Sequence, residues 1–287
     1  MSALALVLAL SAAVAHAAWN VIAHNVSRAG APFLWWGAIA SVVVWGGVIP
    51  FTGGIGTDDI RGFLLGVGVS AALHMLYMTV LQRGYQVGEL STVYATARGS
   101  GPFLSVIIAM VLLGERPSAI ALGGVALVLL GVVGIGFIDR PASGVRRGPD
   151  PAVLFGLLTG VMIAIYTIWD AHAVREWTLS PVAFMVGTTA LQIPFYSVMV
   201  HRRWKVVWHL GRRQWRRIIA FGILSPLSYI LVLQAITIAP VALIAPLREV
   251  SVVLISLFGA FVLKESRPGL RIAASVVVLA GIVLLAF

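Results

Sequence analysis

Residues 94–102, Tyr-Ala-Thr-Ala-Arg-Gly-Ser-Gly-Pro, place Arg98 and Pro102 inside an apolar segment long enough to cross a membrane. Residues 242–251, Ala-Leu-Ile-Ala-Pro-Leu-Arg-Glu-Val-Ser, repeat this pattern 150 residues later around Arg248. The same offset superposes Trp19 on Trp169, Asn20 on Asp170, Gly37 on Gly187, Glu115 on Glu265 and Gly131 on Gly281. With a slip of two residues, Tyr77, Leu81 and Gln82 meet Tyr229, Leu233 and Gln234. The chain is therefore a duplicated unit.

The composition places this protein in a membrane. Of its 287 residues, 60% are hydrophobic and only 10% are charged, and the mean hydropathy is +1.01. A soluble domain of this length needs more charge at its surface. Apolar stretches of about twenty residues, enough to cross a hydrocarbon core of about 30 Å, recur ten times. We predict membrane spans at 2–26, 31–52, 60–82, 90–113, 117–138, 152–173, 178–200, 215–237, 241–263 and 268–287.

The duplication determines the predicted architecture. Each copy contributes five spans, and because five is odd, the second copy enters the membrane with the opposite polarity. We therefore expect an all-α membrane protein of ten transmembrane helices in two inverted five-helix repeats. The first repeat covers residues 1–140, a polar connector covers 141–150, and the second repeat covers 151–287. Inverted repeats are characteristic of secondary transporters, whose substrate sites lie near the midplane between the copies.

Two features of the chain limit other interpretations. Ala15-His16-Ala17 resembles the cleavage site of a secretory signal, but residues 1–10 contain no Lys or Arg and repeat-matched polar residues follow the supposed cut. We therefore expect a retained helix. The absence of cysteine leaves no disulfide framework and no thiolate metal site.

The distribution of basic residues predicts the orientation. The net charge is +10, but the basic residues are spread over interhelical loops, which argues against nucleic-acid binding. Loops on one side, with the nearby Arg271, hold 15 Lys and Arg, and those on the other side hold three, namely Arg61, Arg116 and Arg175. The positive-inside rule then places both termini away from the cytoplasm. We expect a multi-pass protein of a plasma membrane, such as the bacterial inner membrane.

The two intramembrane arginines are the main candidate site residues. An arginine at this depth costs roughly 2.5 to 3.5 kcal/mol on insertion scales, so Arg98 and Arg248 should face a polar cavity or a partner. Tyr94 lies one helical turn before Arg98 on the same face. Two interpretations of Glu249 remain open. It forms a structural ion pair with an arginine, or the arginines bind an anionic group while Glu249 takes protons or competes for them.

Other polar residues inside the spans are predicted to line a pathway or to join helices. His16 and Asn20 share one face of the first span with His24, and Tyr166 and Asp170 occupy the equivalent face of the sixth. The third span contributes His74 and Tyr77, and the eighth contributes Tyr229. We list His16, Asn20, His74, Tyr77, Tyr94, Arg98, Tyr166, Tyr229 and Arg248 as candidate substrate-binding residues. The spacing does not favour a metal site. Glu115 and Glu265, each near Arg and Pro, indicate turns between helices rather than transport groups.

These motifs resemble a known family. Ala17-Ala18-Trp19-Asn20, the run from Tyr94 to Gly99, Gly114-Glu115-Arg116, and Ala245-Pro246-Leu247-Arg248-Glu249 resemble the EamA-type branch of the drug/metabolite transporter superfamily. The resemblance covers the whole chain. It implies a central cavity lined by helices 1, 3, 4, 6, 8 and 9, and commonly the export of small metabolites such as amino acids. Members are commonly drawn with both termini in the cytoplasm, and here the charge distribution predicts the opposite.

We therefore expect a secondary active transporter, and an exporter in particular, of a small polar anionic or zwitterionic metabolite. Arg98 and Arg248 would bind its anionic group, and a proton at Glu249 or a histidine would be the coupling ion. We expect no enzymatic activity and no cofactor. An intramembrane lipid-headgroup enzyme and a lipid-carrier flippase of the same fold are the alternatives. The sequence does not indicate an oligomeric state.

Overall fold

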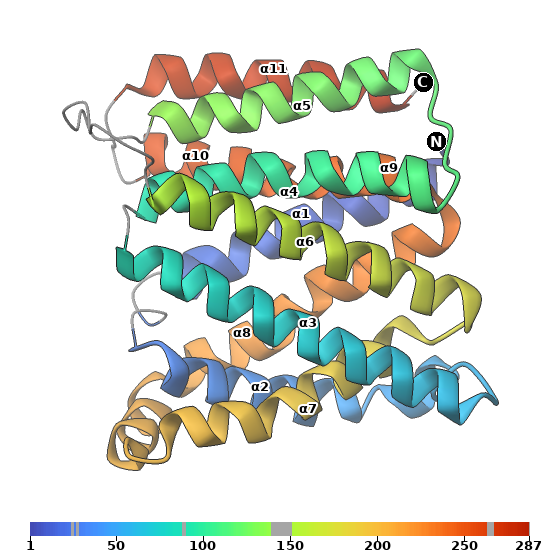
Figure 1. The fold of residues 1–287 in the computed structure, drawn as a ribbon. Coiled ribbons are helices and arrows are strands. Elements are labelled where there is room, and N and C mark those ends of the chain that lie inside the picture. The colour runs from blue at the N-terminus through green and yellow to red at the C-terminus, as the bar shows by residue number, and fades with distance from the viewer. Residues whose placement is uncertain (24–25, 27–28, 88–89, 139–150, 263–266, 287) are drawn as a thin grey trace.

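The computed structural model describes residues 1–23, 26, 29–87, 90–138, 151–262 and 267–286, and all regular structure in these ranges is helical (Figure 1). The predicted connector, His24 and Glu265 lie outside the described residues. The helices are α1 (Ala3–Ala23), α2 (Ala31–Gly46), α3 (Ile60–Val87), α4 (Leu90–Leu112), α5 (Ala119–Ile138), α6 (Pro151–Glu176), α7 (Pro181–Val200), α8 (Trp204–Ile238), α9 (Val241–Arg248), α10 (Val250–Phe261) and α11 (Pro268–Ala286).

The predicted all-helical membrane fold is confirmed. In the described ranges, nine helical segments are long and apolar enough to span a membrane, and α9 and α10 together form one of them, Val241–Gly259. The remaining predicted span, 31–52, is a shorter helix. α2 has 16 residues, or about 24 Å of helix. It ends at Gly46-Gly47, and Pro50 then lies in a short 3₁₀ helix, η2 (Ile49–Thr52).

The largest departure from the predicted boundaries is at α8. This helix begins at Trp204, inside the segment predicted as a loop, and its backbone departs from helical geometry at Gln214 (φ −121°, ψ 20°). Trp204, Val207 and Trp208 are spaced three and four residues apart, so they share one face of a helical turn. Val207 is fully buried, while Arg212 and Arg213 are not. Local amphipathicity thus makes this basic segment helical although it is too polar to span.

The two halves of the chain pack reciprocally. α5 and α11 lie together on one side of the bundle, α2 and α7 lie on the other, and the remaining helices lie between these pairs (Figure 1). α1 packs on α8 as α6 packs on α3, and α4 packs on α6 as α9 and α10 pack on α1. The repeat relates α1 to α6, α3 to α8, and α4 to α9 and α10. Each of these contacts therefore has its counterpart in the other half.

Two pairs of repeat-matched glycines mark close helix crossings. A Cβ on Gly131 of α5 would lie 2.4 Å from a side-chain carbon of Val278, and one on Gly281 of α11 would lie 2.7 Å from the Gly124 carbonyl oxygen. Gly37 of α2 lies against Phe221 of α8, and Gly187 of α7 lies against Val67 of α3. Small residues let helices approach closely in a membrane. The matched glycines therefore stabilise equivalent crossings in the two halves.

One end of the bundle holds the first turn of α1 and the last turn of α11 (Figure 1), and we call it the terminal end. Here Glu115, just after α4, accepts hydrogen bonds from the backbone N–H groups of Val241 and Ala242 at the start of α9, each at 2.8 Å. Arg175 at the end of α6 donates to Glu115 Oε1 at 2.9 Å.

Arg175 also donates to the carbonyl oxygens of Ile236 and Ala239, at 2.9 and 2.7 Å. Those two residues end α8 and precede α9. The interpretation of Glu115 as a mark of a local turn was therefore incomplete, because its carboxylate caps a helix of the other half. We call Glu115, Arg175 and the backbone groups they bind the end network. Its long-range partners have no signal in the local sequence.

Candidate substrate-binding site

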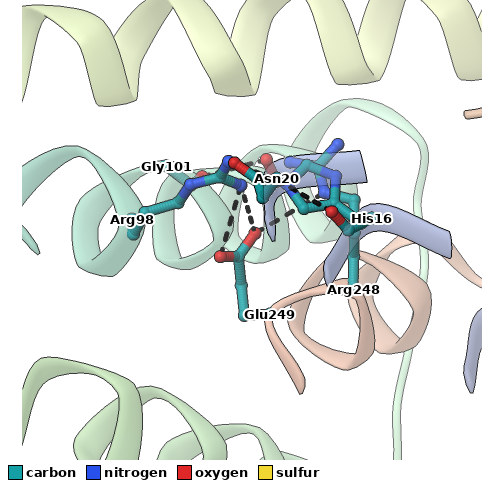
Figure 2. A network of polar contacts seen from close by, with 7 residues as sticks. His16, Asn20, Arg98, Gly101, Arg248 and Glu249 are labelled. Atoms are coloured by element: carbon teal, nitrogen blue, oxygen red, sulfur yellow. Dashed lines mark hydrogen bonds and ion pairs between the residues drawn. The ribbon is translucent and has the colours of Figure 1, made fainter. Parts of the chain in front are cut away.

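The two intramembrane arginines meet at one carboxylate between the two halves. Arg98 on α4 donates from Nη1 to both carboxylate oxygens of Glu249, at 3.3 and 3.5 Å, and Arg248 Nε lies 3.5 Å from Glu249 Oε1 (Figure 2). Glu249 is completely buried, and Arg248 is 6% exposed. We call His16, Arg98, Arg248 and Glu249 the arginine cluster. This ion pair fits both interpretations of Glu249 from the sequence, namely a structural ion pair and a carboxylate that competes with an anionic substrate for the arginines.

A break in the helix places Arg248 and Glu249 together. Neighbouring side chains on a regular helix point about 100° apart, so they do not face each other. α9 ends at Arg248, Glu249 is the capping residue, and α10 begins at Val250. Pro246 in α9 has no N–H to donate to the carbonyl four residues before it, which weakens the helix here. The matching α4 also contains a proline, Pro102, and continues through it as one helix.

α1 contributes a histidine acceptor to the arginine cluster. His16 Nε2 lies 3.2 Å from Arg98 Nη2. A guanidinium can only donate, so Nε2 is the acceptor and the ring hydrogen lies on Nδ1. Asn20, one turn along α1, lies beside the cluster in Figure 2, and its side-chain amide donates to the His16 carbonyl at 2.8 Å. The predicted stripe of His16 and Asn20 thus faces the arginines.

Tyr94 supports the arginine from within its own helix. The Arg98 Cζ atom lies 5.2 Å from the centre of the Tyr94 ring, which is a cation–π distance. Tyr94 and Arg98 are both partly exposed although they lie inside the bundle. The helical spacing that predicted this shared face is therefore reproduced.

A second cluster joins α3, α6 and α8. His74 Nε2 lies 3.8 Å from Asp170 Oδ2, and the Tyr229 hydroxyl donates a hydrogen bond to the same oxygen. The His74 and Tyr166 rings are 4.2 Å apart, and Tyr77 lies 5.5 Å from Tyr166 between ring centres. We call His74, Tyr77, Tyr166, Asp170 and Tyr229 the aspartate cluster. Asp170 is completely buried, and Oδ1 has no hydrogen-bond partner in the described part of the chain.

The structure divides the nine candidate residues between two places. Arg98, Arg248, His16 and Tyr94 gather at Glu249 with Asn20 beside them. His74 and Tyr229 contact Asp170, and the rings of Tyr166 and Tyr77 pack next to them. Asp170 itself was not among the candidates, although its repeat partner Asn20 was. Its match with Asn20 was the available signal. Whether these residues bind substrate stays a prediction.

No metal centre is indicated by the described residues, in which no group of three or more His, Cys, Asp or Glu could hold an ion. A cavity of about 580 Å³ lies at the terminal end, with Arg175, Ser180, Gln234 and Thr237 among its lining residues. Arg175 is already bonded to Glu115 and to two carbonyl oxygens. The lining of this cavity includes no residue of either cluster. Its cation, Arg175, is already neutralised by Glu115.

A comparison with family models finds a match in the second half of the chain. Residues 150–287 match the model of the EamA-like transporter family. A crystal structure recorded as "Crystal structure of protein" superposes with a TM-score of 0.73 and 19% identity, covering 99% of this chain and 96% of that one. At this identity the likeness concerns the fold alone. A comparison with curated proteins found no match.

Proposed function

Because residues 150–287 belong to the EamA-like transporter family, we propose that this protein is a secondary active transporter of a small organic metabolite that carries an anionic group. Family membership implies transmembrane transport, and the family consists generally of transporters that are not enzymes. The chain is a multi-pass membrane protein. The finer parts of the proposal are the anionic or zwitterionic substrate, its export, and alternating access between the two halves.

The observation that supports an anionic substrate is the charge balance of the arginine cluster. Two guanidiniums share one carboxylate, and His16 acts as a neutral acceptor. The cluster therefore holds one positive charge more than it neutralises. Arg248 Nε is buried without a hydrogen-bond partner in the described residues. A carboxylate or phosphate would neutralise the charge and accept forked hydrogen bonds from the guanidiniums.

The helices that carry the arginines are suited to change shape during transport. α4 contains Pro102 one turn after Arg98, and the break between α9 and α10 lies at Glu249. Residues at such breaks absorb backbone rotation during domain movements. We propose that α4 and the α9–α10 pair rearrange here as the site opens to one side and then to the other.

Binding of organic anions to the purified protein tests this proposal. We expect panels of carboxylates and amino-acid zwitterions to raise the unfolding temperature in detergent, and organic cations to have no effect. Arg98→Ala and Arg248→Ala should remove the stabilisation, whereas Arg61→Ala should keep it because Arg61 is exposed at the start of α3. Stabilisation by cations alone would refute the arginine site.

We also propose that the terminal end faces away from the cytoplasm. Arg61, Arg116 and Arg175 lie on this side of the predicted topology, and the larger basic group lies on the other. A reporter that is active only outside the cytoplasm should be active when fused after Phe287. The same reporter inserted in the connector should be inactive. The reverse pattern would invert the orientation and leave alternating access unchanged.

A further inference from the structure

The position of His74 fixes which of its ring nitrogens carries a hydrogen. Its Nδ1 lies 2.9 Å from the carbonyl oxygen of Ser70, one turn earlier on α3. Nδ1 also lies 3.3 Å from the Ser70 hydroxyl oxygen. A carbonyl oxygen only accepts, so the shorter contact is a hydrogen bond that Nδ1 donates. Nε2 then faces Asp170 Oδ2 at 3.8 Å. In a neutral imidazole with this tautomer Nε2 carries a lone pair, so two acceptors would face each other with no hydrogen between them.

Asp170 has no permanent counter-charge in contact with it within the described residues. From α8 it receives the Tyr229 hydroxyl, and from α3 it faces His74 and the Ser70 hydroxyl. From α9, Arg248 acts on it at longer range and makes its ion pair with Glu249 instead. A buried carboxylate without a partner is costly. One proton added between the two residues removes the contact between two acceptors, Nε2 and Oδ2, and compensates the charge of the Asp170 carboxylate.

From this geometry we infer that Asp170 and His74 together bind one proton, and that this pair is the coupling-ion site of the transporter. The inference rests on the proposed transport function. With the proton on Nε2 the two residues form an ion pair across 3.8 Å, and with it on Asp170 the neutral acid faces the Nε2 lone pair. The proton stays while the pair is buried, and it leaves when α3, α6 and α8 separate and admit water. Chains of Asp and His carry protons in this way in other transporters.

Glu249 has the opposite surroundings, so it is a poor proton carrier. Its carboxylate contacts Arg98 and Arg248. A proton placed on Glu249 would leave two guanidiniums with no negative partner in a buried site. The inference therefore assigns the coupling proton to the aspartate cluster and leaves the arginine cluster for the substrate.

The first experiment detects the proton without any substrate. Difference infrared spectra of the detergent-purified protein across a pH titration report the carboxylic-acid and imidazolium bands. We expect one component of the wild-type titration to be missing in Asp170→Asn and to be present in Glu249→Gln. His74→Gln serves as a second variant and should also remove it. Retention of that component in Asp170→Asn, or its loss only in Glu249→Gln, would overturn the inference.

The second experiment separates coupling from folding and from binding, using whichever panel compound stabilises the purified protein. In proteoliposomes, a gradient of about one pH unit supports roughly tenfold accumulation per coupled proton. Asp170→Asn should bring accumulation down to equal concentrations while exchange of labelled for unlabelled compound continues. A merely structural role would reduce both, and retained accumulation in the variant would overturn the inference. If no panel compound is bound or transported, the proposed function fails, and the infrared result still decides the proton site.

Discussion

In the arginine cluster two guanidiniums share one carboxylate, whereas in the aspartate cluster one carboxylate contacts a tyrosine hydroxyl and an imidazole and, within the described part of the chain, no guanidinium. The repeat links the two clusters at one pair of helices, because α1 contributes His16 to the arginine cluster and its partner α6 contributes Asp170 to the aspartate cluster. At the matched positions Asn20 corresponds to Asp170 and His16 to Tyr166. The other helices differ: α4 and α9, which carry the arginines, are repeat partners of each other, and so are α3 and α8. Each cluster therefore combines its own pair of repeat-related helices with either α1 or α6.

The two clusters differ in charge in a way that suits two different species. The arginine cluster has surplus positive charge, and Asp170 has an oxygen with no hydrogen-bond partner among the described residues. In the proposed transport cycle, an anionic group and a proton would bind at these separate places within one bundle. Variants in each cluster test whether the two differ as the contacts indicate.

The largest effect is expected from removing an arginine. Arg248→Ala and Arg98→Ala should each reduce transport in proteoliposomes by about a hundredfold, because truncating one partner of a buried charged contact with a ligand costs about 2 to 5 kcal/mol of binding free energy. Arg61→Ala, which removes an exposed charge, is the control and should transport normally. Normal transport by Arg248→Ala in well-folded protein would show that the arginine cluster is structural.

A smaller but still large effect is expected on stability when each cluster loses its carboxylate. Glu249→Gln leaves two buried guanidiniums unpaired and should destabilise the protein by about 3 to 5 kcal/mol. Asp170→Asn keeps an oxygen that can accept from Tyr229 and should cost only about 1 to 2 kcal/mol. Denaturant unfolding in mixed micelles measures the two values. Equal losses would remove the proposed contrast between the clusters.

The smallest effect is expected when one cluster is made more like the other. Asn20→Asp places a carboxylate beside the arginine cluster. Two like charges about 8 Å apart in a medium of effective dielectric constant about 20 repel each other by about 2 kcal/mol, so the new carboxylate would repel a bound anion by about this amount. Stabilisation by organic anions should weaken accordingly, by more than about tenfold in affinity. Asn20→Gln retains neutrality and is the matched control. Unchanged anion binding in Asn20→Asp would place the anion away from Asn20.

Much of the fold was predictable because it rests on patterns that the chain repeats. Hydropathy located the spans, and the offset between Arg98 and Arg248 identified equivalent helices. The exceptions depend on local backbone chemistry. Gly46-Gly47 ends α2 before it reaches full span length, and the apolar face around Val207 extends α8 through a basic segment. Counting apolar residues does not detect either effect.

The sequence predicted which residues belong to the candidate site better than it predicted how they divide into two clusters. Charge inside a membrane segment identified Arg98, Arg248 and Glu249, and the repeat identified most of their neighbours. The division into two clusters depends on how α3, α6 and α8 cross, which no linear pattern contains. Asp170 gathers His74, Tyr166 and Tyr229 from three helices, and its place at their centre becomes visible only in the packed bundle.

The end network has a consequence for the speed of transport. Glu115 belongs to the first half and holds the first peptide groups of α9 in the second, while Arg175 ties the end of α8 to the same carboxylate. In the proposed alternating-access cycle, opening the terminal end would break these hydrogen bonds. Their loss would add to the activation barrier of the conformational change, and each 1.36 kcal/mol slows such a change tenfold. A carboxylate remote from both clusters would then help to set the turnover number.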